Sequence, residues 1–148
     1  EGFLRITDRK KELLKTAGGK YIAPQPIEVR LKACPLIAHA VVVADGRKCA
    51  TALLVPDFAR LERDARAQDI PTEPRAALLA HPIVRAAFQK AVDDANRELA
   101  PFETIKAFAL LDQDFTIEGG ELTPTLKVKR RVAVEKYGRV IDELYSAH

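Results

Sequence analysis

The feature that most constrains the fold is a pair of apolar runs joined by a tight turn, "AHAVVVADGRKCATALLVP" at residues 38–56. Valine-rich runs favour β-strands, and Asp-Gly between two such runs is a strong signal for a hairpin. We therefore predict two neighbouring strands joined by a turn at Asp45-Gly46.

Further extended segments are expected on both sides of this hairpin. Residues 104–112 have the composition of another strand. Near the start of the chain, residues 3–7 and 12–16 form two short extended runs, and Gly18-Gly19 is a turn signal after them. The chain therefore begins with strands and loops.

Four segments have the apolar spacing of helices. They cover residues 23–34, residues 57–68 with Asp57 as N-cap, residues 81–99 and residues 132–144. The segment 81–99 is the clearest, because Pro82 suits a first helical turn and a single apolar stripe should pack on the sheet. The stripe contains Ile83, Val84, Ala87, Phe88, Ala91, Val92, Ala95 and Leu99. Together these elements predict a small α+β domain, in which helices cover a sheet formed by the hairpin and the 104–112 strand.

The composition is that of a folded, water-soluble domain. The chain has 148 residues, of which 47% are hydrophobic and 30% charged, and a chain of that length buries roughly 68–70% of its surface on folding. It contains no methionine, so we expect it to be a piece of a longer protein. The longest apolar runs are too short for a membrane span of ~20 residues. Together with Cys34 and Cys49, read as reduced and buried thiols, this favours a cytosolic compartment.

Several kinds of catalytic site are disfavoured by the residues present. The single serine, Ser146, lies near the end of the chain, which leaves no credible member for a serine-nucleophile triad. The histidines, His39, His81 and His148, lack the spacing of metal ligands, and we predict no metal site. His39 is expected in a strand and His81 at a helix start. The "GGK" of residues 18–20 lacks the other residues of a nucleotide-binding P-loop.

Positive charge is concentrated at the two ends of the chain, although the net charge is only +3. The first cluster is Arg5, Arg9, Lys10, Lys11, Lys15 and Lys20, and the second is Lys127, Lys129, Arg130 and Arg131. Each could be a solvated charge run, a nucleic-acid contact, or a loop that aims one lysine at a phosphate. The scarcity of aromatic residues to stack on bases argues against nucleic acid.

The second cluster follows a turn, in "LTPTLKVKRR" at residues 122–131. Pro124 between two threonines predicts that turn. If the residues after it are extended, Lys127 and Lys129 point to the same side. A lysine held in this way is a point charge suited to a phosphate or a carboxylate.

Two stretches, "DRKKELLKTAGGKYIAPQPIE" (8–28) and "LTPTLKVKR" (122–130), resemble the C-terminal domain of adenylate-forming enzymes. This superfamily includes acyl-CoA synthetases, luciferases and the adenylation domains of peptide synthetases. The wording of the first stretch is most similar to long-chain fatty-acid–CoA ligases. The resemblance implies that residues 1–11 are the end of a large N-terminal adenylation domain with the hinge, and that residues 12–148 form a mobile lid.

The resemblance also implies roles for individual residues. Asp8 and Arg9 would form a pair at the domain junction that binds the nucleotide, with Arg9 at the ribose, and Lys11 would be the hinge. Lys127 would be the catalytic lysine that contacts the acyl carboxylate and the ATP phosphates. The face used for thioester formation would present Lys15, Gly18 and Gly19 to CoA. One departure is that Lys127 follows Thr125-Leu126, where many relatives have Ser-Gly.

The reaction implied is ATP-dependent activation of a fatty acid to acyl-AMP, followed by transfer to CoA, with the lid rotating in between. ATP, fatty acid and CoA would be substrates, and Mg²⁺ would accompany ATP, bound mainly by the large domain. The expected partner is the chain's own adenylation domain, in the cytoplasm or peripherally at a membrane surface, without nucleic acid. The alternatives are a fatty acyl-AMP ligase, another acyl- or aryl-CoA synthetase, and a small basic nucleic-acid-binding module. The fragment alone should be inactive.

Overall fold

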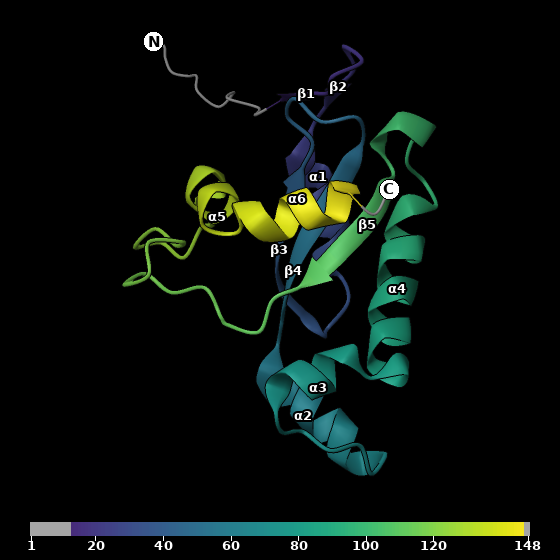
Figure 1. The fold of residues 1–148 in the computed structure, drawn as a ribbon, viewed down its shortest axis with the longest axis vertical. Helices are drawn as coiled ribbons and strands as arrows, with labels where there is room; N and C mark the ends of the chain where they lie inside the picture. Colours follow the sequence, from purple (N-terminus) through teal and green to yellow (C-terminus); the bar gives the residue numbers. More distant parts are fainter. Residues whose placement is uncertain (1–12, 147–148) are drawn as a thin grey trace.

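The centre of the protein is a three-stranded sheet in the order β3-β4-β5 (Figure 1). The structure is a computed structural model that describes residues 13–146. β3 (Ile37–Val43) and β4 (Ala50–Pro56) form an antiparallel hairpin, and β5 (Ile105–Leu110) runs parallel to β4. The predicted hairpin and third strand are confirmed. Gly46 has a φ of 71° in the hairpin turn, a conformation that favours glycine.

Six α-helices of the described residues surround the sheet. They are α1 (Pro24–Lys32), α2 (Phe58–Ala67), α3 (Arg75–Ala80), α4 (Pro82–Asn96), α5 (Arg130–Lys136) and α6 (Gly138–Ser146). In Figure 1, α6 crosses in front of the sheet and α1 lies behind it, while α4 runs alongside β5. The chain between β4 and β5 forms α2, α3 and α4, because a parallel neighbour requires a long crossover. The predicted α+β class is confirmed.

The helix starts follow the local sequence. Asp57 caps α2, because its carboxylate accepts a hydrogen bond from the Arg60 amide at 3.3 Å. His81 caps α4 through its Nδ1, which accepts a hydrogen bond from the Ile83 amide at 3.2 Å. Both helix-start predictions are confirmed, and each capped amide would otherwise lack a partner in the helix.

Burial is greatest in β4, the central strand, where all seven residues are buried. One face of the sheet packs on α1, whose Ile27 and Leu31 are buried. The inner side of α4 contributes Val84, Phe88, Val92 and Ala95. Among residues 13–146, no helix has both the length and the apolar character needed to cross a bilayer.

Four details differ from the predictions. Ile83 was expected in the apolar stripe of α4 but is 51% exposed, because it lies in the first turn, beside the buried stripe of Val84, Phe88, Val92 and Ala95 and not within it. The helix predicted over 132–144 is divided into α5 and α6 at Tyr137, just before a glycine, a residue of low helix propensity. The six-residue α3 was not predicted. Cys34 and Cys49 are free thiols, but they are partly exposed, because both lie at the ends of elements and not inside them.

Candidate functional site

The basic stretch near the end of the chain lies in a loop that doubles back on itself. Leu126 donates its amide hydrogen bond to the Thr123 carbonyl at 2.7 Å, which closes a turn over Pro124 and Thr125. Below the turn, Leu122 and Val128 form an isolated antiparallel bridge. The predicted turn is confirmed, and it presents the residue that follows it, Lys127, near the tip.

The backbone of Lys127 is held on both sides by Thr123. The Lys127 amide donates to the Thr123 hydroxyl at 3.1 Å, and the Thr123 amide donates to the Lys127 carbonyl at 2.8 Å. The hydroxyl of Thr123 also lies 3.0 Å from that of Thr125. The backbone of this lysine is therefore ordered by local bonds, while its side chain is exposed.

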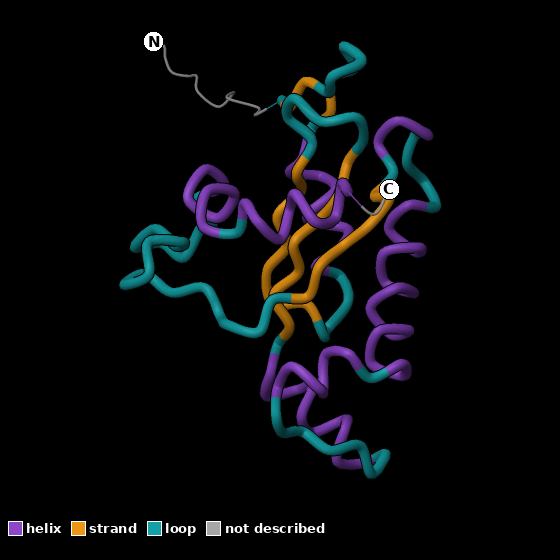
Figure 2. Tube along the Cα trace, in the orientation of Figure 1, coloured by secondary structure: helices purple, strands orange, loops and turns teal. Residues whose placement is uncertain are grey.

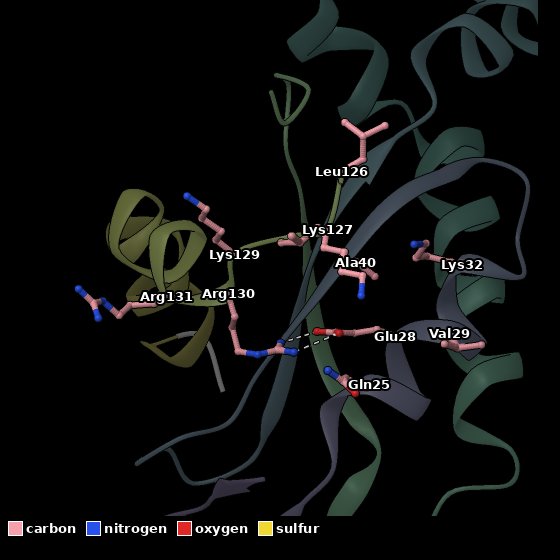
Figure 3. A pocket seen from close by; sticks show the side chains of 11 residues that line it. Gln25, Glu28, Val29, Lys32, Ala40, Leu126, Lys127, Lys129, Arg130 and Arg131 are labelled. Carbon is pink, nitrogen blue, oxygen red and sulfur yellow. Dashed lines mark hydrogen bonds and ion pairs between the residues drawn. The ribbon is translucent and has the colours of Figure 1, made fainter. Parts of the chain in front are cut away.

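The side chain of Lys127 lies at an open groove of about 620 Å³ between the loop and α1. Figure 3 shows it pointing across the groove toward Glu28 and Gln25 of α1. Lys32 lies on the far side of the same groove. Lys127 and Lys32 thus place two ammonium groups at this open space, while Glu28 offsets the charge of Arg130, and such a space suits an anionic group.

Lys129 does not share this direction. We expected Lys127 and Lys129 on the same side of an extended segment, but in Figure 3 the side chains of Lys129 and Arg131 point away from Glu28, although both residues belong to the lining of the groove. The difference arises because the segment is not uniformly extended: Leu126 has a φ of 64°, and α5 begins directly after Lys129. Lys127 is thereby distinguished from its neighbours.

Arg130 has a structural task within the basic cluster. Its guanidinium bonds both carboxylate oxygens of Glu28 on α1 and donates to the Val42 carbonyl of β3 at 3.0 Å. Glu28 in turn accepts from the Val42 amide at 2.8 Å. The side chains of Arg130 and Glu28 are only 14% and 16% exposed. No local pattern in the sequence pairs residues so far apart, and we did not predict this contact.

A buried carboxylate lies at the base of the same loop. Glu121 is 1% exposed, pairs with Lys136 of α5, and accepts from the Thr116 amide at 3.0 Å. Burial raises the pKa of Glu121, but the bonds from Lys136 and Thr116 outweigh it, so the pKa lies below its ordinary value. The same bond raises the pKa of Lys136. Charged residues are expected at the surface, so nothing in the sequence marked this glutamate as buried.

The predicted CoA-side residues lie in a second loop, between β1 (Leu14–Lys15) and β2 (Tyr21–Ile22). Lys15 lies on β1 with its ammonium 5.7 Å from the centre of the Tyr21 ring. Gly18 and Gly19 are exposed at the tip, and Gly19 has a φ of 87°. A side chain other than glycine would be strained there.

This glycine loop is bonded to the turn of the central hairpin. Ala17 donates to the Arg47 carbonyl and Gly46 donates to the Lys15 carbonyl, both at 2.8 Å. The Lys15 amide also donates to an Asp45 carboxylate oxygen at 3.2 Å. The loop is thus fixed to the body of the sheet.

The two loops lie in different parts of the molecule. Figure 2 shows the β1–β2 loop at one end of the sheet and the long loop between β5 and α5 projecting from its side. The structure therefore brings Lys15, Gly18 and Gly19 together, and keeps Lys127 apart from them. Asp8, Arg9 and Lys11 lie outside the described residues. Within residues 13–146, no group of three His, Cys, Asp or Glu side chains is placed to hold a metal ion.

His39 occupies a partly buried position on β3, as predicted for a strand residue. Its ring stacks on Phe115 with the ring centres 5.4 Å apart. Burial lowers the pKa of His39, although the carboxylate of Asp114 opposes this effect. Its surroundings are those of a structural histidine.

Comparison with known protein families matches residues 11–148 to the AMP-binding enzyme C-terminal domain. The chain belongs to this family. A curated relative, the long-chain-fatty-acid–CoA ligase FadD15 of Mycobacterium tuberculosis, is 42% identical over 155 residues, covering 99% of this chain and 24% of the relative. The long-chain-fatty-acid–CoA ligase ACSBG2 of Gallus gallus is 37% identical over 164 residues, covering 99% of this chain and 22% of that protein.

Solved structures give the AMP-binding enzyme C-terminal domain the same architecture. The adenylation domain of a carboxylate reductase from Mycobacterium chelonae has a TM-score of 0.68 and 30% identity, covering 94% of this chain and 20% of that chain. The corresponding domain from Segniliparus rugosus, solved with AMP and a carboxylic acid, has a TM-score of 0.69 and 26% identity, covering 95% of this chain and 20% of its own. The chain thus spans about a quarter or less of the proteins it matches.

Proposed function

We propose that the chain is the C-terminal lid of a long-chain fatty-acid–CoA ligase, with residues 1–11 forming the junction and hinge and residues 12–148 the lid. The enzyme would first join a fatty acid to AMP and then transfer the acyl group to CoA. The observation that carries the proposal is the ordered turn that presents Lys127 at an open, positively charged groove. Family membership and the names of the curated relatives support it.

Lys127 would act in the first half-reaction. A carboxylate oxygen of the fatty acid attacks the α-phosphorus of ATP, and pyrophosphate leaves. Both reactants are anions, so an ammonium placed between them reduces their repulsion and stabilises the charge of the transition state. At 4 Å and an effective dielectric constant near 20, one such attraction is worth about 4 kcal/mol before desolvation.

The glycine loop would act in the second half-reaction, after the lid has rotated about Lys11. Its exposed backbone at Gly18 and Gly19 has no side chains to keep the pantetheine arm of CoA away. Lys15 beside it supplies positive charge for the anionic end of CoA. The separation of this loop from Lys127 suits a lid that presents one face for each half-reaction.

The nucleotide and the metal would be held mainly outside the lid. Asp8 and Arg9 would contact the adenylate from the junction, with Arg9 at the ribose. The Mg²⁺ that accompanies ATP belongs to the substrate, and its ligands would come mainly from the large domain. That adenylation domain is the proposed partner, in the cytoplasm or peripherally at a membrane.

An adenylating enzyme that passes the acyl group to a thiol on a carrier protein is the second candidate. The similarity to carboxylate reductases favours it, because one of these structures is an A-PCP didomain. Both candidates share the first half-reaction and differ in the acceptor of the acyl group.

The test is an assay of the full-length protein with ATP, fatty acids of several chain lengths, and either CoA or a carrier protein. We expect ATP–pyrophosphate exchange that depends on a long-chain fatty acid, and acyl-CoA as the product. Exchange without acyl-CoA would favour the second candidate. The absence of any exchange with carboxylic acids would reject both.

A further inference from the structure

We propose that Glu121 is a positioning residue for Lys127, which holds the loop so that the lysine reaches the reacting phosphate. The inference rests on the proposed role of Lys127 in adenylate formation. It adds a residue that does not itself contact the substrates, because Glu121 is buried at the base of the loop.

The pocket around Glu121 is built for a carboxylate. A buried charge is costly unless it is paired and hydrogen-bonded, and Glu121 has both Lys136 and the Thr116 amide as partners. Gly119 lies so close that a β-carbon there would be 2.5 Å from the Glu121 carboxylate and 2.8 Å from the Thr116 hydroxyl. The backbone of the loop is therefore folded tightly around this side chain.

From Glu121, a series of residue pairs leads to Lys127. The Glu121 carbonyl accepts a hydrogen bond from the Lys129 amide at 2.7 Å. Leu122 and Val128 come next and lie opposite each other, without a hydrogen bond between them, in the bridge that the flanking bonds define. The third pair joins Thr123 and Lys127 through two bonds, at 2.8 and 3.1 Å. The two sides of the loop are thus joined at the first and third of these pairs, between the buried anchor and the lysine.

The tip itself has little else to hold it. Pro124, Thr125, Leu126 and Lys127 are all exposed, and the side chain of Leu126 is 63% exposed. The only contacts of these four residues that the structure records lie within the loop or around the groove. Without the anchor, the lysine would move with an exposed loop, and a displacement of about 1 Å at a reacting centre can lower a rate about 100-fold.

The first experiment compares Glu121→Gln with the unchanged full-length enzyme in each half-reaction. The variant retains the shape of the side chain but loses the charge that Lys136 pairs with. We expect kcat for acyl-adenylate formation to fall about 10- to 100-fold, with KM for ATP changed far less. The rate of thioester formation from supplied acyl-adenylate should stay within about twofold of that of the unchanged enzyme, because the proposed glycine-loop face of the lid acts in that step. Equal losses in both half-reactions would instead mean that Glu121 only stabilises the fold.

A matched pair of variants at Thr123, which bonds Lys127 directly, tests the inference without changing the buried Glu121. Thr123→Val removes the oxygen that accepts the Lys127 amide, whereas Thr123→Ser retains it. Since Thr123 is on the loop and not in the core, both variants should fold. We expect the valine variant to lose adenylate formation about 10-fold and the serine variant to remain near the unchanged enzyme. Equal activity of the two variants would overturn the inference.

Lys127→Ala, measured in parallel, separates this inference from the proposed function. If Lys127→Ala leaves adenylate formation unchanged, the role of the lysine is wrong, and the positioning role of Glu121 is rejected with it. If Lys127→Ala abolishes adenylate formation while Glu121→Gln and Thr123→Val do not reduce it, only the positioning role is rejected.

Discussion

Arg130 and Glu28 are 102 residues apart in the sequence, yet the two terminal nitrogens of the arginine bond the two carboxylate oxygens of the glutamate. Through this pair, the first residue of α5 is joined to α1 on the other side of β3. The Val42 backbone bonds both partners, which leaves these partly buried charges well satisfied.

The first prediction is that Arg130→Gln lowers the free energy of unfolding of the 148-residue chain by about 3 kcal/mol, because it leaves the partly buried Glu28 carboxylate without its charged partner. Arg130→Lys should lose an intermediate amount, since lysine cannot form the two-pronged contact. Urea denaturation followed by circular dichroism measures both. The control is Arg131→Gln, at a side chain that is 91% exposed, with an expected change below about 0.5 kcal/mol.

The second prediction is that Lys127→Ala lowers the rate of acyl-adenylate formation by the full-length enzyme about 10²- to 10³-fold, the usual cost of a lost preorganised charge. Conversion of supplied acyl-adenylate to acyl-CoA should be largely unaffected. Single-turnover assays of each half-reaction make the comparison. Lys129→Ala is the matched control, because this neighbour lies on the same loop but its side chain points away from that of Lys127. A similar loss of adenylation rate in Lys127→Ala and Lys129→Ala would mean that the total positive charge of the loop matters, and not Lys127 in particular.

The third prediction concerns the hinge. Lys11→Pro fixes φ near −65° and removes an amide donor, so it should hold the lid in one orientation, the adenylating one. Acyl-adenylate should still form, while its conversion to acyl-CoA slows by orders of magnitude. Lys11→Ala, which removes only the side chain, should keep both activities. Normal thioester formation by the proline variant would show that the rotation occurs elsewhere.

The fourth prediction concerns acid stability. Because burial lowers the pKa of His39 in the folded chain, the unfolded chain, with an ordinary pKa of about 6.5, binds a proton first as the pH falls. The contribution of His39 to stability is thus complete above pH 6.5 or so and decreases as the pH falls from there toward the folded pKa. His39→Gln should flatten this part of the curve. Melting temperatures between about pH 7.5 and 5.5 measure the effect, with His81→Asn as control.

The elements that the sequence predicted well depend on local patterns. The hairpin around Asp45-Gly46 needs only two valine- and leucine-rich runs and a turn, and α4 needs only a first-turn proline and an apolar stripe. The turn over Pro124 is equally local. Where a pattern extends over neighbouring residues, it can be read before the fold is known.

The details that the sequence did not predict depend on distant partners. Glu121 is buried because Lys136 and the Thr116 amide meet it there, and a charged residue between a glycine and a leucine gives no sign of this. Arg130 had been grouped with the lysines around it, although its partner is on α1. The roles of Lys127, Lys15 and the glycines remain predictions, since they depend on a second domain.

The bonds that join the glycine loop to the turn of the central hairpin have a mechanical consequence. Without these bonds, the loop could bend relative to the sheet while the domain rotates, and its tip would reach variable positions. Because it is hydrogen-bonded at Lys15 and Ala17, the loop moves together with the central sheet. When the sheet rotates by a given angle, the glycines therefore rotate by the same angle.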